Sequence, residues 1–206
     1  MPGDYCEIVA NVRALLILVA MGTTASADPW RFTSWDEIGV LRTRLDMADG
    51  YAVTGEAVRF APHVPIGPNV YIGAELDTGS LSGRVPSDAT YRSSTGGGEQ
   101  VPTAAATGKY GAVRALIGVR MRFGMLSVAG EFAAGLHAAD LQDAYGQEIS
   151  ATHANSTELE GRARVDLWVS PRLTVGAIAG VGLDDSRDAT AGLMLGYHFG
   201  NYDGMR

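Results

Sequence analysis

The chain has 206 residues, a formal net charge of −7, 46% hydrophobic residues and a single cysteine. This length suits one folded domain, or one domain that follows a processed segment. One cysteine cannot build a disulfide framework, so another device must stabilise the fold. Because the chain is acidic and its single lysine is Lys109, we expect no nucleic-acid partner.

The first 27 residues have the order of a secretory signal peptide. Arg13 precedes the apolar run ALLILVAM (14–21), which is too short to span a membrane, and small residues then lead to Ala27. The sequence therefore predicts export, cleavage after Ala27 and a mature domain over residues 28–206.

Two acidic residues, Asp4 and Glu7, stand where a signal peptide is normally basic. A translation start at Val12 would explain them, and we state that start as a hypothesis. Cys6 precedes the apolar run, so it is not placed as a lipid-attachment cysteine and would be removed with the signal peptide.

Apolar and polar residues alternate with a period of two through most of the mature region. In LEGRARVDLWV (159–169), Leu159, Val165 and Leu167 alternate with charged residues. Such alternation is typical of strands with two unlike faces. It is clear in six segments and blurred in the first two. The expected strands cover residues 37–47, 51–61, 69–77, 111–123, 126–136, 159–169, 173–183 and 190–199.

The connections between these strands differ in length. Residues 79–109 and 138–155 form long polar loops, whereas 124–125 and 170–172 form tight turns. Long loops at one end and tight turns at the other are typical of outer-membrane barrels. The regular strands also exceed the roughly five or six residues usual in soluble proteins. The sequence thus predicts an all-β fold, an eight-stranded antiparallel up-and-down transmembrane β-barrel.

The polar face of the expected strands carries charges of both signs and many glycines. If the turn at 170–172 sets the register, Arg162 lies opposite Gly180 and Glu160 opposite Gly182, so long side chains face missing ones. Charges of both signs can pair in a narrow dry interior, where an unpaired charge would be costly. The predicted lumen charge network contains Glu75, Asp77, Arg114, Arg120, Arg122, Glu131, Glu160, Arg162, Arg164 and Asp166.

Glu75 and Asp77 are expected beside the strand that carries Arg120 and Arg122. Since an eight-stranded barrel normally has a filled interior, structural pairing explains these charges better than an ion path. Aromatic residues near the strand ends are expected to form girdles at the two membrane interfaces. They are Tyr71, Phe123, Trp168, Tyr197 and Phe199.

Soluble folds can also alternate in this way. A β-sandwich exposes its polar face to water, and a lipocalin-type barrel is apolar inside and polar outside. A lipocalin-like binder would need apolar residues on the glycine-rich face. The sequence offers few there beyond Leu116, Ile178 and Met194, so we favour the apolar face toward lipid.

The last expected strand, TAGLMLGYHF (190–199), places Leu195 and Tyr197 at alternating positions and closes on Phe199. The mature region resembles the small eight-stranded outer-membrane barrels of the OmpA/OmpX type, and this strand resembles their C-terminal assembly signal. In that family the chain usually stops at the final aromatic residue, whereas GNYDGMR follows here. The resemblance implies the outer membrane of a Gram-negative bacterium, with outer-membrane lipid and the barrel-assembly machinery as partners.

One constellation has the residue types of a hydrolase. His153, Ser156 and Glu160 could supply a base, a nucleophile and an orienting acid, and outer-membrane lipid hydrolases with such a triad exist on this fold. Their spacing matches no catalytic motif, and His153 and Ser156 fall in an expected surface loop. A polar loop is therefore the simpler interpretation.

Two acidic groups have residue types that bind metal ions. Both lie in expected loops, where solvation explains them, so we expect no metal and no cofactor. The groups are His137, Asp140 and Asp143, and Asp184, Asp185 and Asp188.

The sequence as a whole favours a non-enzymatic integral outer-membrane protein with a structural, adhesive or interaction role. Its surface ligand, if it has one, would bind through loops 79–109 and 138–155. Two alternatives stay open, an outer-membrane lipid-modifying hydrolase and a secreted or periplasmic lipocalin-like binder of apolar ligands.

Overall fold

The structure is a computed structural model, and the part of the chain that it describes is one barrel domain. The described residues are 33–46, 52–86, 103–143, 155–183 and 188–199. The predicted signal peptide, the hypothetical start at Val12 and the tail after Phe199 lie outside them.

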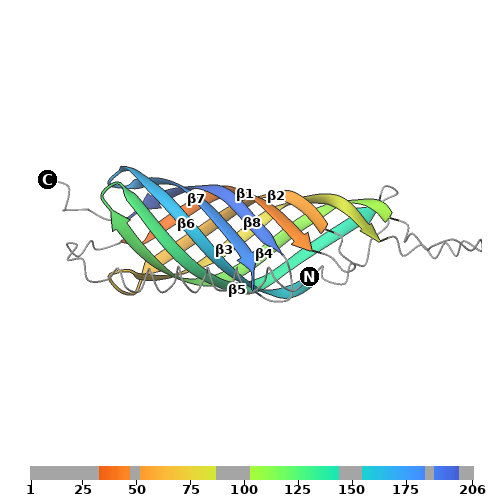
Figure 1. Ribbon diagram of the computed structural model, residues 1–206, viewed down its shortest axis with the longest axis horizontal. Coiled ribbons are helices and arrows are strands. Elements are labelled where there is room, and N and C mark those ends of the chain that lie inside the picture. The colour runs from red at the N-terminus through yellow and green to blue at the C-terminus, as the bar shows by residue number, and fades with distance from the viewer. Residues whose placement is uncertain (1–32, 47–51, 87–102, 144–154, 184–187, 200–206) are drawn as a thin grey trace, which may run out of the picture. The chain divides into compact units, whose positions relative to one another are not determined.

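Eight strands close into one antiparallel barrel, in which each strand pairs with its neighbours in sequence and β8 pairs with β1 (Figure 1). The strands are β1 (Trp35–Asp46), β2 (Ala52–Pro65), β3 (Val70–Pro86), β4 (Thr103–Phe123), β5 (Leu126–Asp143), β6 (Asn155–Ser170), β7 (Leu173–Gly182) and β8 (Ala189–His198). The predicted eight-stranded up-and-down barrel is confirmed. Among the described residues, no helix has the length and apolar character to cross a membrane.

The strands are staggered around the barrel. Directly opposed residues can be followed from Val165 on β6 through each of the seven other strands in turn. This path returns to β6 at Asn155, ten residues from its start. A barrel with this stagger must tilt its strands, and Figure 1 shows their common slant. Eight tilted strands enclose an interior just wide enough for side chains to fill.

Tight turns join the strands at one end of the barrel, which we call the turn end. Gly124 lies between β4 and β5 with φ of 62°, a conformation that L side chains rarely adopt. Residues 171–172 join β6 to β7, and the register predicted from this turn is confirmed, with Arg162 opposite Gly180. We call the opposite end, where β3 leads to β4 and β5 to β6, the loop end.

The prediction that residues 79–109 form a long polar loop is wrong. β3 continues to Pro86 and β4 begins at Thr103, so both ends of this segment belong to the barrel wall. The two extensions pair with each other along their whole length, from Gly79 opposite Tyr110 to the last pair. Residues 87–102 lie outside the described part.

The predicted loop 138–155 is also shorter than expected, because β5 and β6 take in both of its ends and leave only 144–154 outside the described residues. The sequence pattern did not predict these strand extensions, because their inward positions hold small or aromatic residues between polar ones. On β4, for example, Ala106 and Tyr110 are buried while Thr107 and Lys109 are exposed. Alternation of that kind has little hydrophobic contrast.

The two faces of the wall have the polarity expected of a lipid-exposed barrel. Apolar side chains on the outer face of the wall are 41% to 63% exposed: Ile38, Val40, Val58, Phe60, Ile72, Leu76, Val113, Ile117, Phe132, Leu136, Leu159, Val165, Leu167, Val175, Val181, Leu193 and Leu195. The inner face carries buried arginines and carboxylates. A soluble barrel has the opposite arrangement.

The aromatic girdle prediction is right in part. Phe123, Tyr197 and Phe199 are exposed on the outer face, where a girdle would lie. Tyr71 and Trp168 are only 2% and 1% exposed, because they occupy inward positions of their strands. Whether an aromatic residue belongs to a girdle therefore depends on its inward or outward position, and not only on how near it lies to a strand end.

Glycines on the inner face make room for large side chains. Gly118 on β4 lies opposite Tyr71 on β3, and a Cβ at Gly118 would come within 2.8 Å of the tyrosine ring carbon Cε1. Gly130 on β5 faces outward instead, between the buried residues Ala129 and Glu131, and a Cβ there would meet nothing within 4 Å.

Gly118→Val should therefore lower the free energy of unfolding by about 1–3 kcal/mol, the usual cost of overpacking a filled interior. Gly130→Val is the matched control, and it should leave stability nearly unchanged. Urea unfolding of both variants in detergent micelles measures the difference. Equal midpoints for the two variants would show that the interior has room at Gly118.

Candidate functional site

All ten residues of the predicted lumen charge network are buried on the inner face. Three further charged residues lie with them: Glu37, Arg59 and Glu158. Glu37 and Arg59 belong to β1 and β2, where the alternation was blurred. Glu158 has the same inward register as Glu160, so extending the β6 pattern by two residues would have found it.

The network begins with a carboxylate held between two arginines. The Nε and Nη2 atoms of Arg59 donate to the two carboxylate oxygens of Asp77, each at 2.8 Å. Nη1 of Arg114 donates to the same carboxylate at 2.6 Å. Arg114 also donates to Glu158 at 2.9 Å and to the hydroxyl of Tyr110 at 2.6 Å. Residues from β2, β3, β4 and β6 thus meet in the interior.

A second set of contacts centres on Arg162. Its Nη1 and Nη2 atoms donate to Glu75 and Glu160, each at 2.5 Å. Glu75 also lies 3.2 Å from Arg59, which joins this set to the first. Glu160 in turn accepts a hydrogen bond from the hydroxyl of Thr190 on β8.

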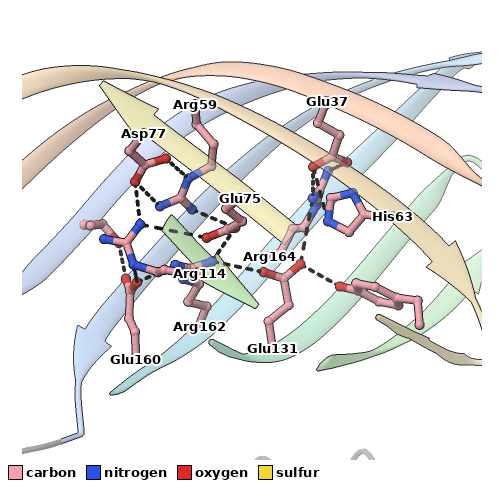
Figure 2. A network of polar contacts seen from close by, with 12 residues as sticks. Glu37, Arg59, His63, Glu75, Asp77, Arg114, Glu131, Glu160, Arg162 and Arg164 are labelled. Carbon is pink, nitrogen blue, oxygen red and sulfur yellow. Dashed lines mark hydrogen bonds and ion pairs between the residues drawn. The ribbon is translucent and has the colours of Figure 1, made fainter. Parts of the chain in front are cut away.

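A third set centres on Arg164. It donates to both carboxylate oxygens of Glu37 and to Asp166 at 2.8 Å. One carboxylate oxygen of Glu131 lies 3.8 Å from Arg164 and the other lies 3.9 Å from Arg162, so Glu131 bridges the second and third sets. Figure 2 shows Arg59, Asp77 and Arg114 toward one side of the network and Glu37 and Arg164 toward the other.

The predicted neighbourhood of Glu75 and Asp77 is confirmed, because β3 pairs with β4, the strand that carries Arg120 and Arg122. The register decides which arginine each carboxylate meets. Glu75 lies opposite Arg114 on β4, and Arg120 binds Asp166 at 2.6 Å instead. Arg122 stacks over Trp168 at 4.0 Å. The sequence could not fix this pairing, since no tight turn connects β3 to β4.

Seven carboxylates and six guanidinium groups make up the network. Burying so many ions is tolerable only if each finds opposite charge and hydrogen-bond partners. Arg59 and Asp77 have no exposed side-chain surface, so no water-sized path passes beside them. The network therefore fills the middle of the barrel.

The turn end of the interior is closed by stacked rings. The Trp35 ring stacks on His63 at 4.5 Å and lies 5.5 Å from His198, and His198 lies 4.3 Å from Trp168. Arg122 covers the outer member of this series. The rings come from β1, β2, β6 and β8, so they tie opposite walls together.

The loop end of the interior is apolar, which corrects the expectation of few apolar residues on the glycine-rich face. Leu116, Ile178 and Met194 do lie inside, but a further cluster lies toward the loop end. That cluster contains Leu45, Val53, Ala57, Leu81, Ala106, Tyr110, Ala112, Ala139 and Leu141. The sequence does not indicate this cluster, because β1 and β2 alternate weakly and the ends of β3, β4 and β5 lie in segments predicted to be loops.

The hydrolase candidates are not brought together as a described site. Glu160 is held by Arg162 and Thr190 inside the barrel. His153 and the side chain of Ser156 lie outside the described part, so the triad stays a prediction.

The metal candidates are divided between two faces. His137 points inward, with Nδ1 3.5 Å from Glu158, whereas Asp140 is exposed on the outer face. Asp188 accepts a hydrogen bond from the backbone N–H of Asp46 at 2.7 Å. The side chains of Asp143, Asp184 and Asp185 are not among those described. Within the described ranges no group of three or more histidine, cysteine or acidic residues could hold a metal ion.

Asp77→Asn should destabilise the barrel by about 3–5 kcal/mol, because it removes the negative charge that the buried Arg59 and Arg114 share. Asp46→Asn makes the same chemical change at an exposed pair, where Arg44 is 54% exposed, and should cost less than about 1 kcal/mol. Urea unfolding in detergent micelles compares the two. A similar small cost at both positions would contradict the structural role of the network.

Comparison with solved structures gives barrels of the same architecture. Ail, the attachment invasion locus protein of Yersinia pestis, was solved in complex with the heparin analogue sucrose octasulfate and is 20% identical, with a TM-score of 0.54 over 82% of this chain and 99% of Ail. Neisserial surface protein A is 11% identical, with a TM-score of 0.56 over 81% of this chain and 97% of its own. No protein-family model and no curated protein sequence matches. With a closed barrel, an apolar outer face and a charged interior, this chain has the fold of the small eight-stranded outer-membrane β-barrels.

Proposed function

We propose that this protein is an integral outer-membrane barrel with a structural or surface-interaction role and no catalytic activity. The observation that carries the proposal is the inverted polarity of the wall. Apolar side chains are exposed around all eight strands, while the charged residues are buried and paired inside.

Water is a poor solvent for such an outer face. Monomeric soluble proteins rarely expose contiguous apolar patches larger than a few hundred Å². Here side chains such as Val113 and Leu193 remain 60% and 62% exposed, with similar neighbours on adjacent strands. A hydrocarbon environment removes that penalty, and closure of the barrel leaves no unpaired strand edge in it.

The interior argues against the two alternative functions. A lipocalin-like binder needs an apolar cavity, whereas ion pairs fill the middle of this interior. A lipid-modifying hydrolase needs an acid free to orient its histidine, and Glu160 is held by Arg162 and Thr190 instead.

A surface role is supported by the polar loop end. Beyond the apolar band, the outer face of β3 carries Ser80, Ser82 and Arg84, and β4 carries Thr107 and Lys109, all exposed. We propose that this end faces the cell exterior and meets a surface partner. The names of the two similar barrels, an attachment invasion locus protein and a surface protein, agree with that role.

The C-terminal strand supports assembly in the outer membrane. Leu193, Leu195 and Tyr197 alternate on the outer face of β8 and Phe199 directly follows it, a pattern that resembles the C-terminal assembly signal of such barrels. We propose outer-membrane lipid and the barrel-assembly machinery as partners.

Protein extracted from the outer-membrane fraction should migrate differently on a gel before and after boiling, because a closed β-barrel resists detergent until it is heated. The measurement is the mobility of boiled and unboiled samples from separated membrane and periplasmic fractions. Protein that is found soluble in the periplasm with no mobility shift would overturn the proposed location.

The orientation can be tested with single cysteines placed at opposite ends of the barrel, in a chain with Cys6→Ser. Thr107→Cys at the loop end should react with a membrane-impermeant maleimide in intact cells. Arg172→Cys at the turn end should react only after the outer membrane is opened. Labelling of Arg172→Cys alone in intact cells would mean that the barrel is inserted the other way.

A further inference from the structure

A groove of about 650 Å³ crosses the outer face of the barrel over β8, β1, β2 and β3. Its lining includes the small residues Gly79, Ala191 and Gly192 and the exposed side chains of Val40, Arg42 and Glu56. No residue of the charge network described above lines the groove.

The groove lies across the boundary between the apolar band and the polar loop end. On its turn-end side one row of the ladder contains the exposed residues Val40, Val58 and Leu193, and this row ends at the polar Thr78 on β3. The next row of outward positions toward the loop end contains Arg42 and Glu56, so polarity changes within two residues of each strand. The groove therefore has an apolar side and a polar side.

The polar side offers charges that have no partner. Arg42 and Glu56 lie directly opposite each other on β1 and β2, yet no ion pair or hydrogen bond joins them to each other or to any other side chain in the described part of the chain. Ser80 lies opposite Glu56 on β3, and Thr78 is exposed beside it. This contrasts with the interior, where the charges of the network are paired.

We propose that the groove binds a phosphorylated glycolipid of the outer leaflet. The phosphate oxygens of the lipid accept hydrogen bonds from the Arg42 guanidinium, which is suited to bidentate contact with them. Sugar hydroxyls donate to Glu56 and exchange hydrogen bonds with Thr78 and Ser80. The acyl chains of the lipid lie along Val40, Val58 and Leu193, which belong to the apolar band of the outer face.

The mixed chemistry of the polar side favours a glycolipid over a simple anionic phospholipid. A carboxylate beside the guanidinium would repel a headgroup that presents only phosphate, such as that of phosphatidic acid, whereas it accepts hydrogen bonds from a sugar. The inference rests on the proposed outer-membrane location, because only that location puts such a lipid beside the loop end.

The experiment uses full-length protein produced and processed in cells, extracted from the outer membrane, stripped of lipid and kept folded in mild detergent. Lipid A, dephosphorylated lipid A and phosphatidic acid are titrated separately, and native mass spectrometry counts the bound molecules. Arg42→Gln removes the phosphate contact, and Arg84→Gln is the matched control, since Arg84 is exposed at the loop end outside the groove. Ala191→Phe fills the groove, and Ala177→Phe places the same bulk on the outer face outside it.

The unchanged protein should bind lipid A more tightly than either other lipid. Arg42→Gln should weaken lipid A binding by about tenfold, the effect of one lost charge-assisted hydrogen bond, while Arg84→Gln leaves it unchanged. Ala191→Phe should reduce binding and Ala177→Phe should not. Equal losses in Arg42→Gln and Arg84→Gln would point to general electrostatic attraction and overturn the site. Equal binding of phosphatidic acid would overturn the choice of a glycolipid.

The proposed location and the proposed glycolipid site can be disproved independently. If the protein is recovered from the periplasm, the proposed location is wrong before any lipid is added. If it is a heat-modifiable barrel in the outer membrane but Arg42→Gln binds lipid A as well as the unchanged protein, only the glycolipid site is wrong. Each variant is first checked for the gel mobility of the folded barrel, so that loss of binding is not confused with loss of fold.

Discussion

The structure depends on the pairing of opposite charges inside a narrow closed barrel. An isolated ion in such a place would be very costly, and removing one partner of a buried pair leaves that cost uncompensated. Asp77, held between Arg59 and Arg114, shows how the cost is met, since three strands contribute to one contact. The same contacts that neutralise the charges also tie distant parts of the wall together.

This arrangement also accounts for the absence of large side chains at many inward positions. An arginine that reaches across the interior needs space opposite its own strand. The ladder provides it where Arg162 faces Gly180 and where Tyr71 faces Gly118. Closure, tilt and the distribution of glycine are therefore parts of one packing solution. Inverting it, with apolar residues inside and charges outside, would give a soluble barrel from the same topology.

The outer face follows simpler rules and carries the proposed functions. Apolar residues cover the wall from the turn end up to a boundary at which Val40 gives way to Arg42 on β1 and Val58 to Glu56 on β2. Inside the barrel charge is matched with charge, whereas at this boundary Arg42 and Glu56 have no partner among the described residues. The asymmetry separates a filled structural interior from an exterior that is available for lipids and surface partners.

The sequence by itself determined the fold class, the number of strands and which face of the regular strands is charged, because alternation with a period of two depends only on local geometry. It also determined the pairing of Arg162 with Gly180, since a tight turn fixes the register of a hairpin. Only the tertiary structure decided that Glu75 lies opposite Arg114, how far β3 and β4 extend, and that Tyr71 points inward. These features depend on register across a long connection and on closure of the barrel, and neither is encoded in any short stretch of residues.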